Sequence, residues 1–329
     1  MRILSCLLIL CIFLNTSCSN AHQESFQYFK NAEKAYLKGD YKEAIIWCYE
    51  KAAELGNTHA MCKLGAMYSQ GLGVIEDRQE AIKWYKKAAD LGNTDAMCKL
   101  GAMYAYGIYA HGIGVSQDYQ EAFKWFKRSA ELGNTNAMCL LGDMYVYGVN
   151  VNKDLEKAIK WYKKAAELGN TNAMCELGTM YSIGLVVIED PQEAIKLYKR
   201  AADLGNTDAM RKLGNMYLLG DVLHKDPEEG IRWYTKAAKL GDGSAMYDLG
   251  FTYDLGLVLP CDPQEAIKCY RKGAELGNTD AMRELGSRYV DGRITPSDYK
   301  QAKYWIKKAY DAGDLSAQKY WNEFQLWKY

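Results

Sequence analysis

Hydrophobic and polar positions follow a pattern that repeats over most of this chain. Each copy ends in a phrase of the form Ala-Ala-Glu-Leu-Gly, as at 52–56 and 165–169. The closing glycines are 36 residues apart, except for one interval of 41, which extra residues around 108–112 explain. A period of this length is typical of a repeat that contains two helices. The closing glycines are Gly56, Gly92, Gly133, Gly169, Gly205, Gly241, Gly277 and Gly313.

Each period predicts two amphipathic helices, which we name helix A and helix B. Gly92 can adopt the left-handed conformation that ends a helix, and Asn93 can cap the helix that follows. We expect helix A over 96–104 and helix B over 121–130. In both segments the apolar residues recur three and four positions apart, as one buried face requires. The pattern therefore predicts an all-α protein built of helix pairs.

One set of helix A positions hardly changes between repeats, which predicts a packing face. Ala60, Met61 and Leu64 of one copy return as the same residue types in later copies. A glycine in the middle of a helix costs about 1 kcal/mol relative to alanine, so its return predicts close approach of the partner helix. The glycines and tyrosines that we expect to be structural are Gly65, Tyr68, Gly101, Tyr104, Gly142, Tyr145, Gly178, Tyr181, Gly214, Tyr217, Gly250, Tyr253, Gly286 and Tyr289.

A second set of helix A positions, which we name the variable stripe, changes from copy to copy. Its positions lie about three residues apart, on one side of the helix. The position directly after the tyrosine varies as well, from Ser69 to Asp254. A constant face and a variable face on one helix indicate a scaffold that presents a customised surface. The candidate partner-binding residues are Lys63, Ala66, Lys99, Ala102, Asp143, Glu176, Thr179, Lys212, Asn215, Asp248, Phe251 and Glu284.

The phrases Ala-x-x-Leu-Gly-x-Met-Tyr-x-x-Gly and Ala-Ile-x-Trp-Tyr-x-Lys-Ala-Ala resemble the Sel-1-like repeat, a branch of the tetratricopeptide superfamily. Seven copies match in register over 57–313. The resemblance implies an α-solenoid, a right-handed superhelix of stacked antiparallel helix pairs, with the A helices lining its concave surface. It also implies that this surface binds a protein or a peptide.

The segments on either side of the seven copies differ from them. Residues 24–56 resemble a divergent tetratricopeptide helix pair, in which 45–49 contains one residue more than the later copies. The extra residue predicts a bulge or a register shift. Residues 314–329 predict a capping helix whose Trp321, Phe324 and Trp327 cover the last hydrophobic layer.

Residues 1–21 have the character of an export signal. The apolar run 3–14 is too short to span a bilayer and has the length of a signal-peptide core. Two processing routes stay open. Cleavage after Ala21 would release a soluble chain, whereas a lipoprotein signal ending before Cys18 would acylate that cysteine, although Asn15 stands where an aliphatic residue is usual. We expect an exported protein of the periplasm or cell envelope, or a secreted one, without a transmembrane helix in the mature chain.

Charge and motifs argue against several classes of function. Lys and Arg together number 41, as do Asp and Glu, whereas nucleic-acid binding normally requires a basic excess. The chain has no phosphate loop, dinucleotide fingerprint or nucleophile elbow, so we expect no cofactor. His59 and Cys62 are three apart on helix A, but two ligands do not make a metal site.

The cysteines of the repeats predict free thiols. Cys62, Cys98, Cys139 and Cys175 occupy one position of consecutive copies, where stacked helices lie about 8–10 Å apart and a disulfide cannot form. A cysteine-rich secreted branch of the family joins cysteines eight residues apart within a repeat, and no copy here has that pair. Cys261 and Cys269 are eight apart across a loop and helix B, a spacing that only permits a disulfide.

An enzyme is the alternative that the resemblance raises, because members of the cysteine-rich branch have been described as binding β-lactams. Serine β-lactamases need Ser-x-x-Lys with Ser-Asp-Asn and Lys-Thr-Gly. Ser297 with Lys300, and Ser316 with Lys319, fit the first string, but the chain has neither partner motif. We interpret both serines as helix caps. The prediction is therefore a non-catalytic binding scaffold, with binding or hydrolysis of β-lactams or peptidoglycan fragments as the alternative and a secreted factor acting on a host cell as a weaker one.

Overall fold

A computed structural model of the chain describes residues 21–44, 49–106, 117–184, 190–220, 225–256, 261–291 and 297–328. The predicted signal segment up to residue 20, with Cys18, and the extra loop residues around 108–112 lie outside these ranges. The chain divides into two units, Met1–Leu168 and Gly169–Tyr329.

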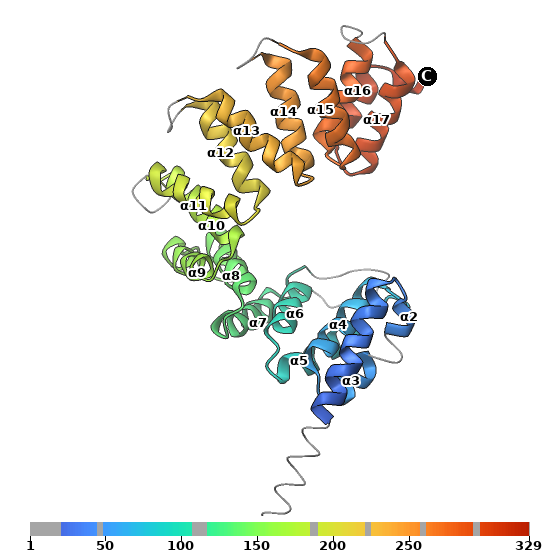
Figure 1. Cartoon of the computed structure of the whole chain (residues 1–329), viewed down its shortest axis with the longest axis vertical. Helices are drawn as coiled ribbons and strands as arrows, with labels where there is room; N and C mark the ends of the chain where they lie inside the picture. The colour runs from blue at the N-terminus through green and yellow to red at the C-terminus, as the bar shows by residue number, and fades with distance from the viewer. Residues whose placement is uncertain are drawn as a thin grey trace, which may run out of the picture. The chain divides into compact units, whose positions relative to one another are not determined.

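In the first unit, helices follow one another along the chain and pack on their neighbours in sequence (Figure 1). Residues 21–37 form the first helix. It is followed by α2 (Tyr41–Glu43), α3 (Glu50–Glu54), α4 (Thr58–Gln70), α5 (Arg78–Asp90), α6 (Thr94–Tyr106), α7 (Tyr119–Glu131), α8 (Thr135–Tyr147) and α9 (Leu155–Glu167). Helix A is α4, α6 and α8, and helix B is α5, α7 and α9.

The second unit continues the same alternation. Its elements are α10 (Thr171–Ser182), α11 (Pro191–Asp203), α12 (Thr207–Leu219), α13 (Pro227–Lys239), α14 (Gly243–Leu255), α15 (Pro263–Glu275), α16 (Thr279–Asp291), α17 (Tyr299–Asp311), α18 (Ala317–Glu323) and the 3₁₀ helix η2 (Leu326–Lys328). The even-numbered helices α10 to α16 are helix A, and the odd-numbered α11 to α17 are helix B. The predicted fold class, an α-solenoid of stacked helix pairs, is confirmed.

Each helix pair is closed into an antiparallel hairpin by one backbone hydrogen bond. The N–H of Asp77, which precedes α5, donates to the carbonyl of Tyr68 near the end of α4 at 2.9 Å. The carboxylate of Asp77 then accepts from the N–H of Glu80 and caps helix B. The same backbone bond recurs in six further pairs, from Asp118 to Tyr104, Asp154 to Tyr145, Asp190 to Tyr181, Asp226 to Tyr217, Asp262 to Tyr253 and Asp298 to Tyr289.

Asparagine joins consecutive repeats. The Oδ1 of Asn93 accepts from the N–H of Ala96 at 2.8 Å and caps α6, as predicted. Its Nδ2 donates to the hydroxyl of Thr58, one repeat earlier, at 3.3 Å. The preceding Gly92 has φ +88°, and its N–H and that of Asn93 bond to carbonyls of α5, which confirms the predicted left-handed helix end.

The constant glycines of helix A lie against rings of helix B. Gly178 is buried, and a Cβ added to it would lie 2.6 Å from Cε1 of Tyr198. Gly142 faces Tyr162 at 2.5 Å and Gly101 faces Phe126 at 2.6 Å on the same measure. In the last pair Gly286 faces the aliphatic Ile306. The predicted close approach at these glycines is therefore observed.

The two ends differ in part from expectation. Ala44 and Tyr49 are π-helical, in agreement with a bulge, and 45–48 between them lie outside the described residues. Trp321 and Phe324 pack on the last hydrophobic cluster as predicted. Trp327 does not, because its side chain is 53% exposed and the neighbouring Leu326 is buried instead. No described helix has the length and apolar character that crossing a membrane would require.

The glycine contact predicts unequal costs for two alanine substitutions. Gly178→Ala should lower thermal stability, because overpacking against the rigid Tyr198 ring costs about 1–3 kcal/mol and exceeds the gain of about 1 kcal/mol in helix propensity. Gly286→Ala should cost less, because the aliphatic Ile306 side chain, whose Cδ1 and Cγ1 would lie 2.7 Å from the new Cβ, can change rotamer where a ring cannot. Thermal unfolding followed by circular dichroism measures both, and equal losses in the two variants would contradict the prediction.

Candidate functional site

The predicted stripe residues all reach the surface. None of Lys63, Ala66 and the other candidates is buried, whereas the constant glycines of the same helices are. The A helices therefore have the two faces that the comparison of repeats predicted. The stripe residues do not all have the same surroundings, however.

In the first unit, three stripe residues line one hollow. A depression of about 230 Å³ lies between α4 and α6, with Ala66, Lys99 and Ala102 in its wall. The space results from alanine at the same stripe position of two consecutive repeats, where later repeats have larger side chains. The remaining wall comes from Ser69, Gln70, Arg78, Tyr85, Met103 and Tyr106.

The charges of this hollow are basic. Arg78 forms an ion pair with Glu76, at 2.7 Å. Lys99 has no ion-pair partner among the residues described, and no carboxylate lines the hollow. Lys63 lies outside it, where it forms an ion pair with Glu33 at 3.5 Å and lies over the ring of Tyr36. The sequence grouped Lys63 with Lys99, but only Lys99 is unpaired.

The second stripe position is coupled to the buried ring of helix B. Asp143 accepts a hydrogen bond of 2.5 Å from the hydroxyl of Tyr162, nineteen residues later. Burial raises the pKa of Asp143, and the bond from Tyr162 opposes the rise. Thr179 bonds to Tyr198 at 3.1 Å, and Asn215 accepts from Tyr234 at 2.5 Å. These three stripe residues thus satisfy internal hydroxyls, a role that the sequence analysis missed.

In two earlier repeats the stripe residue is alanine, which cannot bond to a hydroxyl of the helix B ring. Ala66 cannot bond to Tyr85, and Ser69 takes that role. Burial raises the pKa of Tyr85 to about 12, and the hydrogen bond with Ser69 opposes the rise. Ala102 is paired with Phe126, which has no hydroxyl to satisfy. The spacing was visible in the sequence, because Asp143, Thr179 and Asn215 each precede a tyrosine of helix B by nineteen residues.

Phe251 cannot form a hydrogen bond with the buried tyrosine hydroxyl of its own pair. It occupies the stripe position nineteen residues before Tyr270, and its side chain is 42% exposed. Tyr270 is fully buried, and no described group forms a hydrogen bond with its hydroxyl. The ring of Phe251 stacks instead on the ring of Tyr247, with centroids 6.1 Å apart. An exposed phenyl group thus stands where other repeats place the partner of the buried hydroxyl.

Two ion pairs between repeats frame Phe251. On one side Arg211 of α12 donates to Asp248 at 2.6 Å, and on the other Arg288 of α16 pairs with Asp254. Burial raises the pKa of Asp248, and Arg211 opposes the rise. The sequence analysis did not single out Arg211, which occupies the position held by cysteine in four earlier repeats.

The remaining stripe residues lie near these pairs or at the rim. Glu284 lies 3.6 Å from Arg288, and burial raises the pKa of its carboxyl group. Lys212 is 3.7 Å from Asp208 on its own helix, and Glu176 is exposed. The stripe is therefore mostly paired in the second unit.

The repeat cysteines form no disulfide, and their surroundings favour the protonated thiol. Burial raises the pKa of Cys62 and Cys98 to about 11 and that of Cys175 to about 12. Cys261 and Cys269 are free as well, so the disulfide that their spacing permits is not formed. No cluster of three or more metal-ligating side chains occurs in the described ranges.

The serines of the two Ser-x-x-Lys strings lie directly before helices, where their contacts are local. The hydroxyl of Ser297 donates to the carbonyl of Val290, and Asp298 rather than Ser297 caps α17. Ser316 precedes α18, but its side chain makes no capping bond. Our interpretation of Ser297 as a helix cap is therefore wrong, whereas Ser316 does occupy the N-cap position of α18, without a capping bond from its side chain. The bond to Val290 gives Ser297 a local role in the turn before helix B.

Thiol burial predicts an order of alkylation. At pH 8 iodoacetamide should modify the exposed Cys261 well before Cys62, Cys98 and Cys175. A raised pKa lowers the fraction of each of these three cysteines that is present as the reactive thiolate. Between pH 8 and pH 11 the rates at Cys62, Cys98 and Cys175 should rise as their thiols ionise. Peptide mapping by mass spectrometry resolves each site. Alkylation of these three cysteines at the rate of Cys261 at pH 8 would contradict this order.

The sequence and the fold match known proteins. The family model for the Sel1 repeat matches 28–57, 58–93, 94–134, 135–170, 171–206, 207–242, 243–278 and 279–314. A comparison with curated proteins gives no match.

Many solved structures are similar, including the following three. A protective antigen of uropathogenic Escherichia coli with an SLR fold is 32% identical, with a TM-score of 0.62 over 92% of this chain. This chain spans 65% of that protein's length. A Sel1 repeat protein from Oxalobacter formigenes is 36% identical, with a TM-score of 0.67 over 75% of this chain and 99% of its own. An immunity protein from Pseudomonas aeruginosa, 24% identical with a TM-score of 0.50 over 67% of this chain and 82% of its own, shares the fold alone.

Proposed function

The chain belongs to the Sel1 repeat family, and we propose that it binds a protein partner through the variable stripe of its A helices. Proteins built of this repeat are generally scaffolds for protein–protein interaction. The family resemblance implies that the stripe lies on a concave surface. The proposal assigns the binding to particular residues of each unit.

The main support for the proposal is that Phe251 exposes an aromatic ring while the buried hydroxyl of Tyr270 has no hydrogen-bond partner among the described residues. Leaving the Tyr270 hydroxyl buried without a partner costs about 1–3 kcal/mol. The exposed Phe251 ring recovers little of this cost in the free protein, because almost half of it stays in water. Sites that lower stability in this way are expected where a residue serves binding. Phe251 is therefore the anchor that we assign to the partner.

The surroundings of Phe251 fit an interface hot spot. Such sites place an aromatic side chain at the centre and polar groups around it. Here the ring of Tyr247 stacks on Phe251 from the same helix, and the aspartates of the Arg211–Asp248 and Arg288–Asp254 pairs lie three positions before and after it. Both ion pairs are already satisfied within the protein, so they orient a partner more than they attract it.

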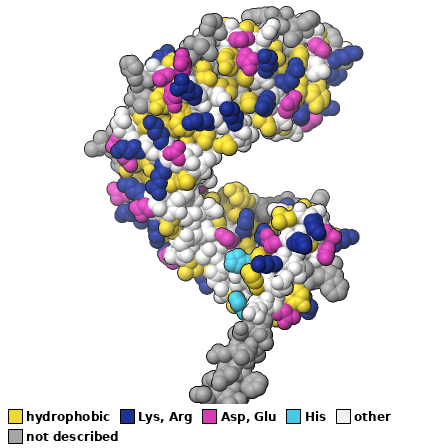
Figure 2. All heavy atoms as spheres, in the orientation of Figure 1, with side chains coloured by type: hydrophobic (Ala, Val, Ile, Leu, Met, Phe, Trp, Pro, Cys, Tyr) yellow, Lys and Arg dark blue, Asp and Glu magenta, His cyan; other side chains and the backbone are white. Residues whose placement is uncertain are grey.

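The first unit offers a second contact of different chemistry. Lys99, a cation without an ion-pair partner among the described residues, lines the hollow made by Ala66 and Ala102, with the hydroxyl of Ser69 and the amide of Gln70 in the same wall. A partner side chain that carries a carboxylate fits these groups. Figure 2 shows basic, acidic and hydrophobic side chains interspersed over the visible face of the second unit. A partner of mixed charge suits that distribution.

Replacement of Phe251 tests the proposal by two readouts of opposite sign. Phe251→Asn places at this position the residue that satisfies Tyr234 in the preceding repeat. We expect unfolding stability to rise by about 1 kcal/mol, because the Tyr270 hydroxyl gains an acceptor. Capture of the partner from an envelope extract should fall by about tenfold or more, as for loss of a hot-spot side chain.

The control variant is Leu240→Asn, which removes an apolar side chain that is 59% exposed and lies outside the stripe. It should capture the partner as well as the native chain does. A stable Phe251→Asn variant that captures the same proteins in the same amounts would rule out Phe251 as the anchor. The variant Lys99→Glu, measured beside it, tests the contact in the first unit separately.

We also propose that the chain is exported, on the character of residues 1–21. In a bacterial host, the mature protein should lack this segment and occur in the envelope or the medium. Intact mass and N-terminal sequencing separate the two processing routes, since cleavage after Ala21 leaves His22 first and lipoprotein processing leaves an acylated Cys18. Under the second route Cys18→Ala abolishes acylation. A chain that retains Met1 in the cytoplasm would contradict export.

A further inference from the structure

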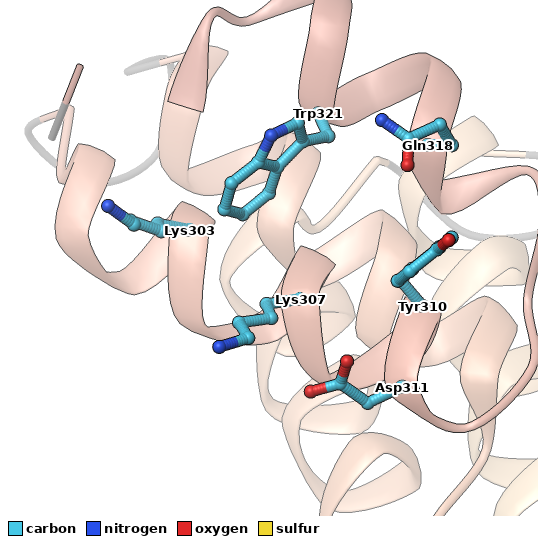
Figure 3. Close-up of a pocket in the computed structure, with 6 residues that line it drawn as sticks. All are labelled: Lys303, Lys307, Tyr310, Asp311, Gln318 and Trp321. Carbon is cyan, nitrogen blue, oxygen red and sulfur yellow. The ribbon is translucent and has the colours of Figure 1, made fainter. Parts of the chain in front are cut away.

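The end of the second unit contains a pocket of about 470 Å³ between α17 and α18 (Figure 3). This volume falls within the range of about 300–1,000 Å³ that is usual for ligand sites. Helix B and the capping helix form the pocket, so it does not belong to the A-helix stripe. Its lining residues are Lys303, Lys307, Tyr310, Asp311, Gln318 and Trp321.

The pocket exists because the last pair departs from the repeat. Lys303 stands 36 residues after Ile267, and Tyr310 stands 36 residues after Ala274, both of which are buried. In addition, α18 has 7 residues, whereas the helix A of the preceding pair, α16, has 13. The short helix leaves part of α17 uncovered. To be soluble, the end face of a repeat stack needs only polar residues. Here the aromatic rings of Tyr310 and Trp321 lie beside the lysines.

The charges of the pocket favour an anion. Lys303 and Lys307 contribute two ammonium groups, and neither has an ion-pair partner among the residues that the structure describes. Asp311 is the one carboxylate in the lining, and Figure 3 shows it at the opposite end from Trp321. The Nζ of Lys303 lies 5.9 Å from the centre of the Trp321 ring, which keeps this cation beside the aromatic surface.

The rings favour a flat apolar group. Trp321 is partly exposed and points from α18 toward the two lysines, and Tyr310 borders the pocket on its other side (Figure 3). Offset or edge-on contacts between aromatic rings contribute about 0.5–1.5 kcal/mol each beyond the area that they bury. The amide of Gln318 can bond to a peptide backbone between them.

We propose that this pocket binds an acidic peptide segment of a protein, with one aromatic side chain between Trp321 and Tyr310 and a neighbouring carboxylate on Lys303 and Lys307. A small inorganic anion would leave both rings without a role. Another copy of the repeat does not fit, because Lys303 stands where four earlier repeats place a buried isoleucine, namely Ile82, Ile159, Ile195 and Ile267.

The test is an NMR titration of the purified chain, labelled with ¹⁵N, using three synthetic peptides. They are N-acetylated and C-amidated Glu-Phe-Glu, Gln-Phe-Gln and Glu-Ala-Glu. The indole signal of Trp321 is assigned by its loss in Trp321→Leu, which places at 321 the residue type of the preceding repeat. The signal should shift and saturate with Glu-Phe-Glu, and the other two peptides should bind about tenfold more weakly.

Charge variants on one helix complete the test. Lys307→Glu should weaken Glu-Phe-Glu binding about tenfold, whereas Lys300→Glu, on α17 but outside the pocket, should leave it unchanged. An unmoved Trp321 signal, equal shifts with Gln-Phe-Gln, or equal effects of the two lysine variants would overturn the proposal. Phe251→Asn should not alter this titration, so the pocket and the A-helix stripe can fail independently.

Discussion

Contact between a glycine of helix A and a ring of helix B sets the spacing of the whole repeat. The ring of Tyr198, for example, lies so close to Gly178 that no side chain fits between the two helices. At this distance the ring is buried, and its hydroxyl has to be satisfied by a neighbour. The adjacent stripe residue is the group within reach, which is why Thr179 bonds to Tyr198. Close packing on one face therefore restricts the chemistry of the other face.

This coupling changes the meaning of variability in the stripe. Asp143 and Asn215 differ in charge, yet each accepts a hydrogen bond from the tyrosine of its own pair. Their difference alone does not indicate partner binding. Phe251 differs in another way, because it satisfies nothing inside the protein and exposes an aromatic ring. The residues that depart from the internal rule, rather than all those that vary, are the better candidates for function.

The sequence was sufficient for features that rest on local chemistry. The left-handed Gly92 and the capping Asn93 follow from preferences of single residues, and the close approach at Gly178 follows from its return in each copy. It was insufficient where a contact joins different repeats. Arg211 and Asp248 are 37 residues apart, and no spacing rule for one helix pairs them. The hollow beside Lys99 was also hidden, since it results from the side-chain volume that Ala66 and Ala102 lack.

The ends of a stack follow a different rule from its interior. An interior pair is covered by the next one, so Ile267 and Ala274 can be apolar and small. The last pair is covered by the short α18 and by η2, and the same positions carry Lys303 and Tyr310. Replacing apolar residues by charged ones makes an end face soluble, and it also removes the need for exact packing there. Positions released from packing in this way can acquire binding chemistry without loss of stability, whereas Phe251, inside the stack, exposes its ring at the cost of an unsatisfied hydroxyl.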